Sequence, residues 1–105
     1  MYGTIARFQV KPGKADALLG LSQRWTDEGE IPGLLGDYVY QMDAEPDIYY
    51  LAVMFESKEA YFANAKSPAQ DARFREMMEY MVAEPVWHDG EIVFAVSTLR
   101  VGQGL

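Results

Sequence analysis

Apolar and polar side chains alternate through the first segment of the chain. Between residues 4 and 10, Ala6 and Phe8 share one face of an extended strand, and Arg7 lies on the other face. A Pro-Gly turn follows, after which apolar residues recur at helical spacing until glycine and proline end the pattern. The pattern predicts a strand over residues 4–10 and a helix over residues 14–28.

The middle of the chain predicts a hairpin. Residues 38–42 are rich in β-forming side chains, residues 43–47 form a polar turn, and residues 48–55 are apolar throughout. A strand that is apolar on both faces needs cover on both sides. In a chain this short, helices cover one face, and we expect a second copy of the chain to cover the other.

Serines mark the helix starts in the second half of the chain. Ser57 precedes a short helical stretch, and Ser67-Pro68-Ala69-Gln70 supplies an N-cap, a proline at the first helical position and a capping-box glutamine. The helix that follows carries an apolar stripe formed by Phe74, Met77, Met78 and Met81. We expect this helix to end at Glu84-Pro85, and the closing strand to cover residues 92–96 with an extension to Val101 left open.

These elements follow the order β-α-β-β-α-β of the ferredoxin-like, split βαβ fold. We therefore predict one α+β domain over residues 1–105, with an antiparallel sheet whose first and third strands are central and whose helices cover one face. Pairing of the uncovered faces of two copies would give a homodimer of the dimeric α/β barrel type.

Composition narrows the classes of partner. The 105 residues suffice for one domain, and 9 basic against 16 acidic residues give a net charge of −7. Such a surface repels phosphate backbones and anionic lipid headgroups, so we expect no nucleic-acid partner and no membrane partner. The absence of cysteine excludes disulfides and thiol catalysis. Because no export signal is evident either, we expect a cytoplasmic location.

Several short pieces together resemble the antibiotic biosynthesis monooxygenase family of dimeric α/β barrels. They are residues 10–13 at the end of the first strand, the Ile31-Pro32-Gly33 entry to the second, residues 55–61 after the third, and Ser67 with the helix that it opens. The resemblance implies the dimeric barrel fold. The family includes cofactor-independent oxygenases of polyphenolic aromatics, heme-degrading monooxygenases and many proteins of unknown activity.

Within that family, heme degradation is disfavoured. The heme-degrading branch uses an asparagine before the first-strand arginine, a tryptophan after the third strand and an iron-approaching histidine in the last helix. The matching positions here hold Ala6, Asn64 and Phe74. A phenyl ring has no lone pair to offer iron. The resemblance therefore implies oxygenation of a small aromatic without cofactor or metal, in which the ring itself reduces dioxygen after losing a proton.

His88 and Arg7 are the candidate catalytic residues. His88 is the only histidine, and histidine as a residue type suits proton removal at neutral pH, although an exposed histidine beside Asp89-Gly90, a turn signal, needs no function. Arg7 lies in the middle of a strand expected to be central. There it would either stabilise a phenolate or form a structural ion pair.

A substrate pocket between sheet and helices would draw on aromatic and methionine side chains. The candidates are Trp25, Tyr49, Tyr50, Tyr61, Phe74 and Met78, with Met77 and Met81 beside them. Such stripes are more often plain hydrophobic core, and only a cavity would distinguish the two. Tyr38 and Tyr40 are predicted dimer contacts, because tyrosine is enriched in interface cores.

Two functions stay open at this point. The leading hypothesis is a cofactor-independent monooxygenase that oxygenates a small polyphenolic aromatic within a homodimer. The alternative is a non-enzymatic dimeric module of the same fold that binds a small ligand or serves in a stress response. No catalytic motif decides between them, so the sequence leaves open whether the chain is an enzyme.

Overall fold

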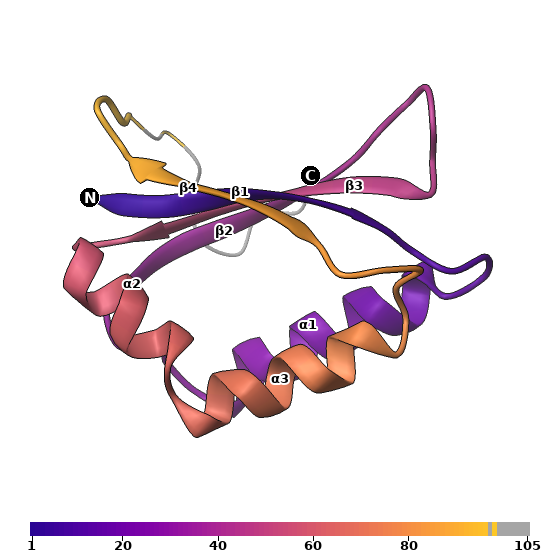
Figure 1. The fold of residues 1–105 in the computed structure, drawn as a ribbon, viewed down its shortest axis with the longest axis horizontal. Helices are drawn as coiled ribbons and strands as arrows, with labels where there is room; N and C mark the ends of the chain where they lie inside the picture. The colour runs from indigo at the N-terminus through magenta and orange to yellow at the C-terminus, as the bar shows by residue number, and fades with distance from the viewer. Residues whose placement is uncertain (97, 99–105) are drawn as a thin grey trace.

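Four strands and three helices make up the part of the chain that the computed structural model describes, residues 1–96 and 98. The strands form one antiparallel sheet in the order β2-β3-β1-β4, so β1 and β3 are central as predicted. All three helices lie on the same face of the sheet (Figure 1). In chain order the elements are β1 (Tyr2–Gln9), α1 (Ala15–Glu28), β2 (Leu34–Gln41), β3 (Ile48–Phe55), α2 (Lys58–Ala65), α3 (Pro68–Met78) and β4 (Val86–Glu91).

The alternation predicted for β1 is confirmed. Thr4, Ala6 and Phe8 are buried on the helix-facing side of the sheet, whereas Ile5 and Arg7 are exposed on the other side. The neighbouring central strand β3 continues the same pattern, because the antiparallel register places its residues opposite β1 residues of the same face. This register decides which side chains can face a site between sheet and helices.

The hydrophobic core lies at the end of the sheet where β1 finishes. Its buried members are Phe8, Val10, Leu18, Tyr49 and Met81. The rings of Phe8 and Tyr49, a cross-strand pair, stack with centroids 5.7 Å apart and planes 11° from parallel. The core therefore joins the two central strands to α1 and to the segment that follows α3.

The predicted helix starts are confirmed at both serines. Ser57 Oγ accepts a hydrogen bond from the Ala60 backbone N–H at 3.1 Å, and Ser67 Oγ accepts one from the Gln70 N–H at 3.1 Å. The capping box at Ser67 is one-sided, because the Gln70 side chain accepts a hydrogen bond from Arg73 Nε instead.

The predicted end of α3 is wrong. The helix stops at Met78 with Glu79 as its C-cap, before the Glu84-Pro85 boundary. The chain then turns so that Met81 forms an isolated antiparallel bridge with Val10. Leaving the helix lets the Met81 side chain reach the buried core, which outweighs the helical continuation that its spacing predicted.

The predicted closing strand is also wrong. The strand that pairs with β1 is Val86–Glu91, whereas residues 92–96 have no regular structure and Phe94 is 81% exposed. The Asp89-Gly90 turn signal is overridden because both residues pair with the start of β1. The extension considered to Val101 lies largely outside the described residues.

Candidate functional site

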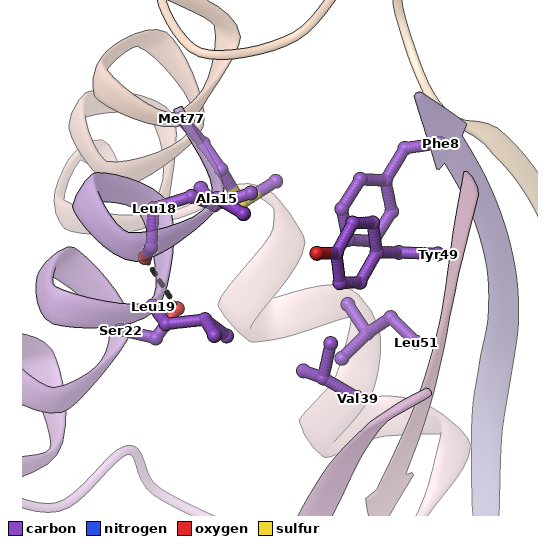
Figure 2. A pocket seen from close by; sticks show the side chains of 9 residues that line it. All are labelled: Phe8, Ala15, Leu18, Leu19, Ser22, Val39, Tyr49, Leu51 and Met77. Atoms are coloured by element: carbon purple, nitrogen blue, oxygen red, sulfur yellow. Dashed lines mark hydrogen bonds between the residues drawn. The ribbon is translucent and has the colours of Figure 1, made fainter. Parts of the chain in front are cut away.

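A small cavity of about 40 Å³ lies between the sheet and the helices (Figure 2). Its lining is almost wholly apolar and comes from β1, β2, β3, α1 and α3. The lining residues are Phe8, Ala15, Leu18, Leu19, Ser22, Val39, Tyr49, Leu51 and Met77. The cavity adjoins the hydrophobic core, since Phe8, Leu18 and Tyr49 belong to both.

The strand register brings the sheet side of the cavity together. Tyr49 and Leu51 are two positions apart on β3 and so share the helix-facing side, and Val39 pairs with Leu51 across from β2. In Figure 2 the Phe8 and Tyr49 rings face the α1 side chains across the cavity. The result is a flat aromatic wall on one side and a flexible aliphatic wall on the other.

Polar groups in the lining are few. The Ser22 hydroxyl donates a hydrogen bond to the Leu18 carbonyl at 3.2 Å within α1, so its proton is already engaged (Figure 2). The other lining side chains are hydrocarbon apart from the Tyr49 hydroxyl and the Met77 sulfur. Such a surface suits an apolar or aromatic ligand.

The cavity is small for that purpose. At roughly 10–15 Å³ per water molecule it has room for a few waters, and it is well below the ~150 Å³ that accommodates a benzene ring in other proteins. Leu19 is exposed and Met77 is only partly buried, so both can move aside. A ligand with one or more rings would enter by displacing them.

The six predicted pocket residues are scattered. Tyr49 lines the cavity, and Met78 packs against the adjoining core. Phe74 lies against Trp87, with ring centroids 6.3 Å apart, and Trp25 on α1 does not contribute to the lining. Tyr50 faces the opposite side of the sheet, and Tyr61 lies on α2.

Sequence reasoning missed most of the sheet wall. Val39 and Leu51 are aliphatic, and the search for aromatic candidates passed over them. Phe8 had already been assigned to the same face as Ala6 by the alternation of β1. Combining that alternation with the hairpin register would have placed all three in one wall.

The predicted catalytic residues lie on the other face of the sheet. Arg7 pairs with Tyr50 and Val86, and His88 pairs with Ile5, all on the side without helices. Within one chain, neither side chain faces the cavity. Among the described residues, Arg7 takes part in none of the ion pairs, so the structural ion pair considered for it is not observed there. The catalytic roles of His88 and Arg7 stay predictions.

Asp37 is an ionisable group on the cavity side of the sheet. It lies on β2 two residues before Val39 and pairs with Val53, which places it on the helix-facing side. Burial of its carboxyl group raises the pKa of Asp37. Asp37 as a whole is an exposed residue, so the desolvation of its carboxyl group is only partial.

A second polar group lies where α2 meets the sheet. The Tyr61 hydroxyl donates a hydrogen bond to Asp89 Oδ1 at 2.8 Å, and the Tyr61 ring packs against Phe55 and Tyr2. Burial, and then the hydrogen bond to Asp89, raise the pKa of Tyr61 to about 12, although the nearby Thr4 hydroxyl acts in the opposite direction. Tyr61 is therefore neutral throughout the physiological range.

Within residues 1–96 and 98, no group of three or more histidine, cysteine or acidic side chains is arranged to hold a metal ion. None of the helices in the same part of the chain combines the length and the apolar character needed to cross a bilayer.

A four-stranded antiparallel sheet with helices on one face defines a ferredoxin-like α+β domain, here with a small apolar cavity between the sheet and the helices. The family model for antibiotic biosynthesis monooxygenase matches residues 1–76, more than half of the chain. The chain therefore belongs to the antibiotic biosynthesis monooxygenase family.

Solved structures share the fold. A protein from Chloroflexus aurantiacus J-10-fl, provisionally assigned as an antibiotic biosynthesis monooxygenase, is 23% identical, with 91% of this chain and 96% of that chain covered and a TM-score of 0.74. A protein from Caulobacter crescentus CB15 with the same provisional assignment is 20% identical, with 89% and 90% covered and a TM-score of 0.76. A conserved protein from Methanosarcina mazei Go1 is 20% identical, with 85% and 89% covered and a TM-score of 0.74.

At such low identity these likenesses establish the fold alone. No curated protein matches the chain. The activity must therefore be argued from the site.

Proposed function

We propose that this chain is a cofactor-independent monooxygenase that binds a small electron-rich aromatic between the sheet and the helices. The observation that carries the proposal is the cavity itself, an apolar space with the stacked Phe8 and Tyr49 rings as one wall in a member of this family. A flat ring would lie against that wall, and the flexible Met77 would close over it.

The proposed reaction needs no resident redox group. An anthrone-like substrate loses a proton from its ring methylene, and the resulting carbanion transfers electrons to dioxygen. One oxygen atom becomes the new carbonyl and the other leaves as water, so anthrone and dioxygen give anthraquinone and water. The protein would contribute a dry pocket, a fixed orientation and a proton acceptor.

Three residues compete for the proton-handling and charge-stabilising roles. His88 and Arg7 lie on the open face of the sheet, so they would act only on a substrate bound at that face. Asp37 is on the same face as the cavity, and its raised pKa makes it a better base than an ordinary aspartate. We therefore propose Asp37 as the base for chemistry in the cavity.

The homodimer is part of the proposal. The sheet face opposite the helices presents Ile5, Tyr40 and Val86, each more than half exposed. A patch of this kind marks an interaction site, and a second copy of the chain supplies a face of the same character. A cytoplasmic location also stays part of the proposal, because the cysteine-free chain asks for no oxidising compartment.

A pair of matched alanine variants tests the proposed site. Ala15 lines the cavity at the start of α1, whereas Ala17 is exposed on the same helix. Ala15→Leu would fill the cavity and should lower the kcat/KM for anthrone oxidation at least about tenfold, measured as oxygen uptake. Ala17→Leu should leave it unchanged. Equal activity in the two variants would place the chemistry elsewhere.

Variants of the three ionisable residues assign the base. Asp37→Asn should abolish oxygen uptake while His88→Ala and Arg7→Ala retain it. The reverse result would move the reaction to the open face of the sheet.

The small size of the cavity favours one alternative, a non-enzymatic dimeric module that binds a small ligand or acts in a stress response. Saturable binding of an aromatic ligand without any oxygen uptake would support this alternative against the enzyme.

A further inference from the structure

The helix side of the cavity is the side that can widen. The sheet side is fixed by backbone pairing of β3 with β1 and with β2. The opposite side consists of α1 side chains and of Met77 from α3 (Figure 2). Because a ring system is larger than the present cavity, its entry requires α1 to move away from Met77.

The second half of α1 is held weakly. Leu18 and Leu21 are the buried residues of the helix, whereas residues 22–28 are all exposed or half-buried. Gly20 lies in mid-helix, where a Cβ would meet nothing within 4 Å, so no packing contact demands a glycine there and the helix loses stability by having one. Little apolar surface leaves the core when this half of α1 moves, and elements of this kind open locally.

An ion pair joins this half of α1 to α3. Arg24 Nη2 donates a hydrogen bond to Glu76 Oε2 across the two helices. Arg24 is two residues beyond Ser22, and Glu76 directly precedes Met77, so each partner is close in sequence to a residue that lines the cavity. The pair therefore resists the movement that would widen the cavity.

The other ion pairs in the described part of the chain do not link separate elements. Arg24–Glu28 and Arg75–Asp71 each connect positions four apart in one helix. The side chains of Arg24 and Glu76 are 52% and 48% exposed, so water and salt compete with their contact. Exposed pairs of this kind change an equilibrium by a small factor. Such a factor is sufficient to set how often α1 leaves α3, but too small to hold the two helices together permanently.

We propose that α1 is a gate over the cavity and that the Arg24–Glu76 ion pair is its latch. This inference rests on the proposed function, which it deepens by describing how an aromatic ring enters a space that is too small for it in the closed state. Neither latch residue lines the cavity, so the latch is the same in the closed protein with and without ligand. Weakening the latch should therefore speed entry and exit equally and leave the Kd unchanged.

Binding kinetics test the latch. The probe is N-phenyl-1-naphthylamine, an uncharged aromatic that fluoresces in apolar sites, and stopped-flow fluorescence at neutral pH gives its association and dissociation rate constants. Arg24→Gln and Glu76→Gln should each raise both rate constants about threefold, as expected for the loss of one exposed ion pair. A variant that carries both substitutions should be no faster than either single variant, because the two residues act through one contact.

Matched controls separate the latch from general effects of charge and stability. Arg75→Gln removes an arginine of α3 that pairs within its own helix, and it should bind the probe at the wild-type rates. Arg24→Gln and Glu76→Gln change the net charge in opposite directions, so a general charge effect could not accelerate both. Raising NaCl from about 0.02 M to about 1 M should accelerate wild type more than Glu76→Gln, because salt weakens the latch that the variant lacks. Circular dichroism checks that every variant is folded.

The outcomes distinguish the gate from the proposed function. If the probe binds and the latch variants show wild-type rate constants, the gate is wrong and the aromatic site stands. If dissociation alone accelerates and the Kd rises, Arg24 and Glu76 stabilise the bound state, which also overturns the gate. If the probe does not bind at all, the proposed site fails, and a gate over it fails with it.

Discussion

Truncation of Phe8 tests the core and the cavity together. The side chain is 6% exposed, stacks on Tyr49 and lines the cavity, so Phe8→Ala removes one of the two stacked rings of the aromatic wall. Phe→Ala substitutions in protein cores cost about 3–5 kcal/mol. Because part of the Phe8 ring already faces empty space, it makes fewer contacts than a fully packed ring, and we expect a loss near the lower end, about 3 kcal/mol. For a domain of this size that corresponds to a fall in Tm of roughly 12 °C.

The assay is urea unfolding followed by circular dichroism, at one fixed protein concentration because a dimer makes stability depend on concentration. Val82→Ala is the control, since Val82 is exposed next to the core residue Met81. It should change stability by no more than about 0.5 kcal/mol. The enlarged cavity in Phe8→Ala should also bind benzene, which at a hundredfold excess over its Kd would restore about 2.7 kcal/mol. A loss below about 1 kcal/mol would refute the assignment of Phe8 to the core, and an absence of benzene rescue would refute its place in the cavity wall.

Three further predictions address other parts of the molecule. Because burial raises the pKa of Asp37, the native state binds its proton more tightly than the unfolded state, and stability falls as pH rises from 3.8 through the raised value. Asp37→Asn lacks this fall, so its stability relative to wild type, measured by urea unfolding, should increase between acidic and neutral pH. If the difference in stability between the variant and wild type is the same at every pH, the carboxyl group of Asp37 is not desolvated. Gly33→Ala should lower the Tm more than Gly13→Ala does. Both glycines have positive φ, but only at Gly33 would the new Cβ lie 2.7 Å from Ala60 Cβ. Equal Tm values for the two variants would exclude this clash. Tyr40→Asp should reduce the mass from light scattering to that of the 11.9 kDa chain, and a persistent dimer would place the interface elsewhere.

The sequence was sufficient for the elements whose signals are local. The alternation of β1 predicted its buried face, and the serine caps at Ser57 and Ser67 predicted where two helices begin. The central position of β1 and β3 followed from the order of elements, because the split βαβ arrangement leaves few alternatives. These features depend on near neighbours in the chain or on a general topological rule.

The position of β4 could not be obtained in this way. Asp89-Gly90 is a strong turn signal, and the apolar run that begins at Ile92 looked the better strand. Pairing with β1 selects residues 86–91 as the strand instead, because their backbone gains a ladder of hydrogen bonds. Local strand propensity does not include this contribution. The same error placed His88 in a turn, whereas it lies within β4 and pairs with Ile5.

The composition of the site was missed for a different reason. Tyr49 and Tyr50 are adjacent and equally aromatic, yet the pleat sends one to the cavity and the other to the open face. Residue type alone cannot separate them, but strand parity can. The register of β1 and β4 likewise places Thr4 and Asp89 on the same face of the sheet.

We assign ligand binding to one face of the sheet and association to the other. Because alternate residues of a strand lie on opposite faces, the two functions can be changed separately by substitution. Odd positions of β1, such as Ile5 and Arg7, face the proposed dimer partner, whereas even positions, such as Ala6 and Phe8, face the helices. Substitutions at the odd positions should therefore change association without changing ligand binding, and substitutions at the even positions should do the reverse. If Ala15→Leu altered the dimer, or Tyr40→Asp abolished oxygen uptake at a concentration where the variant stays folded, the ligand site would extend through the sheet to the partner subunit. His88 and Arg7 would then regain a direct route to the substrate.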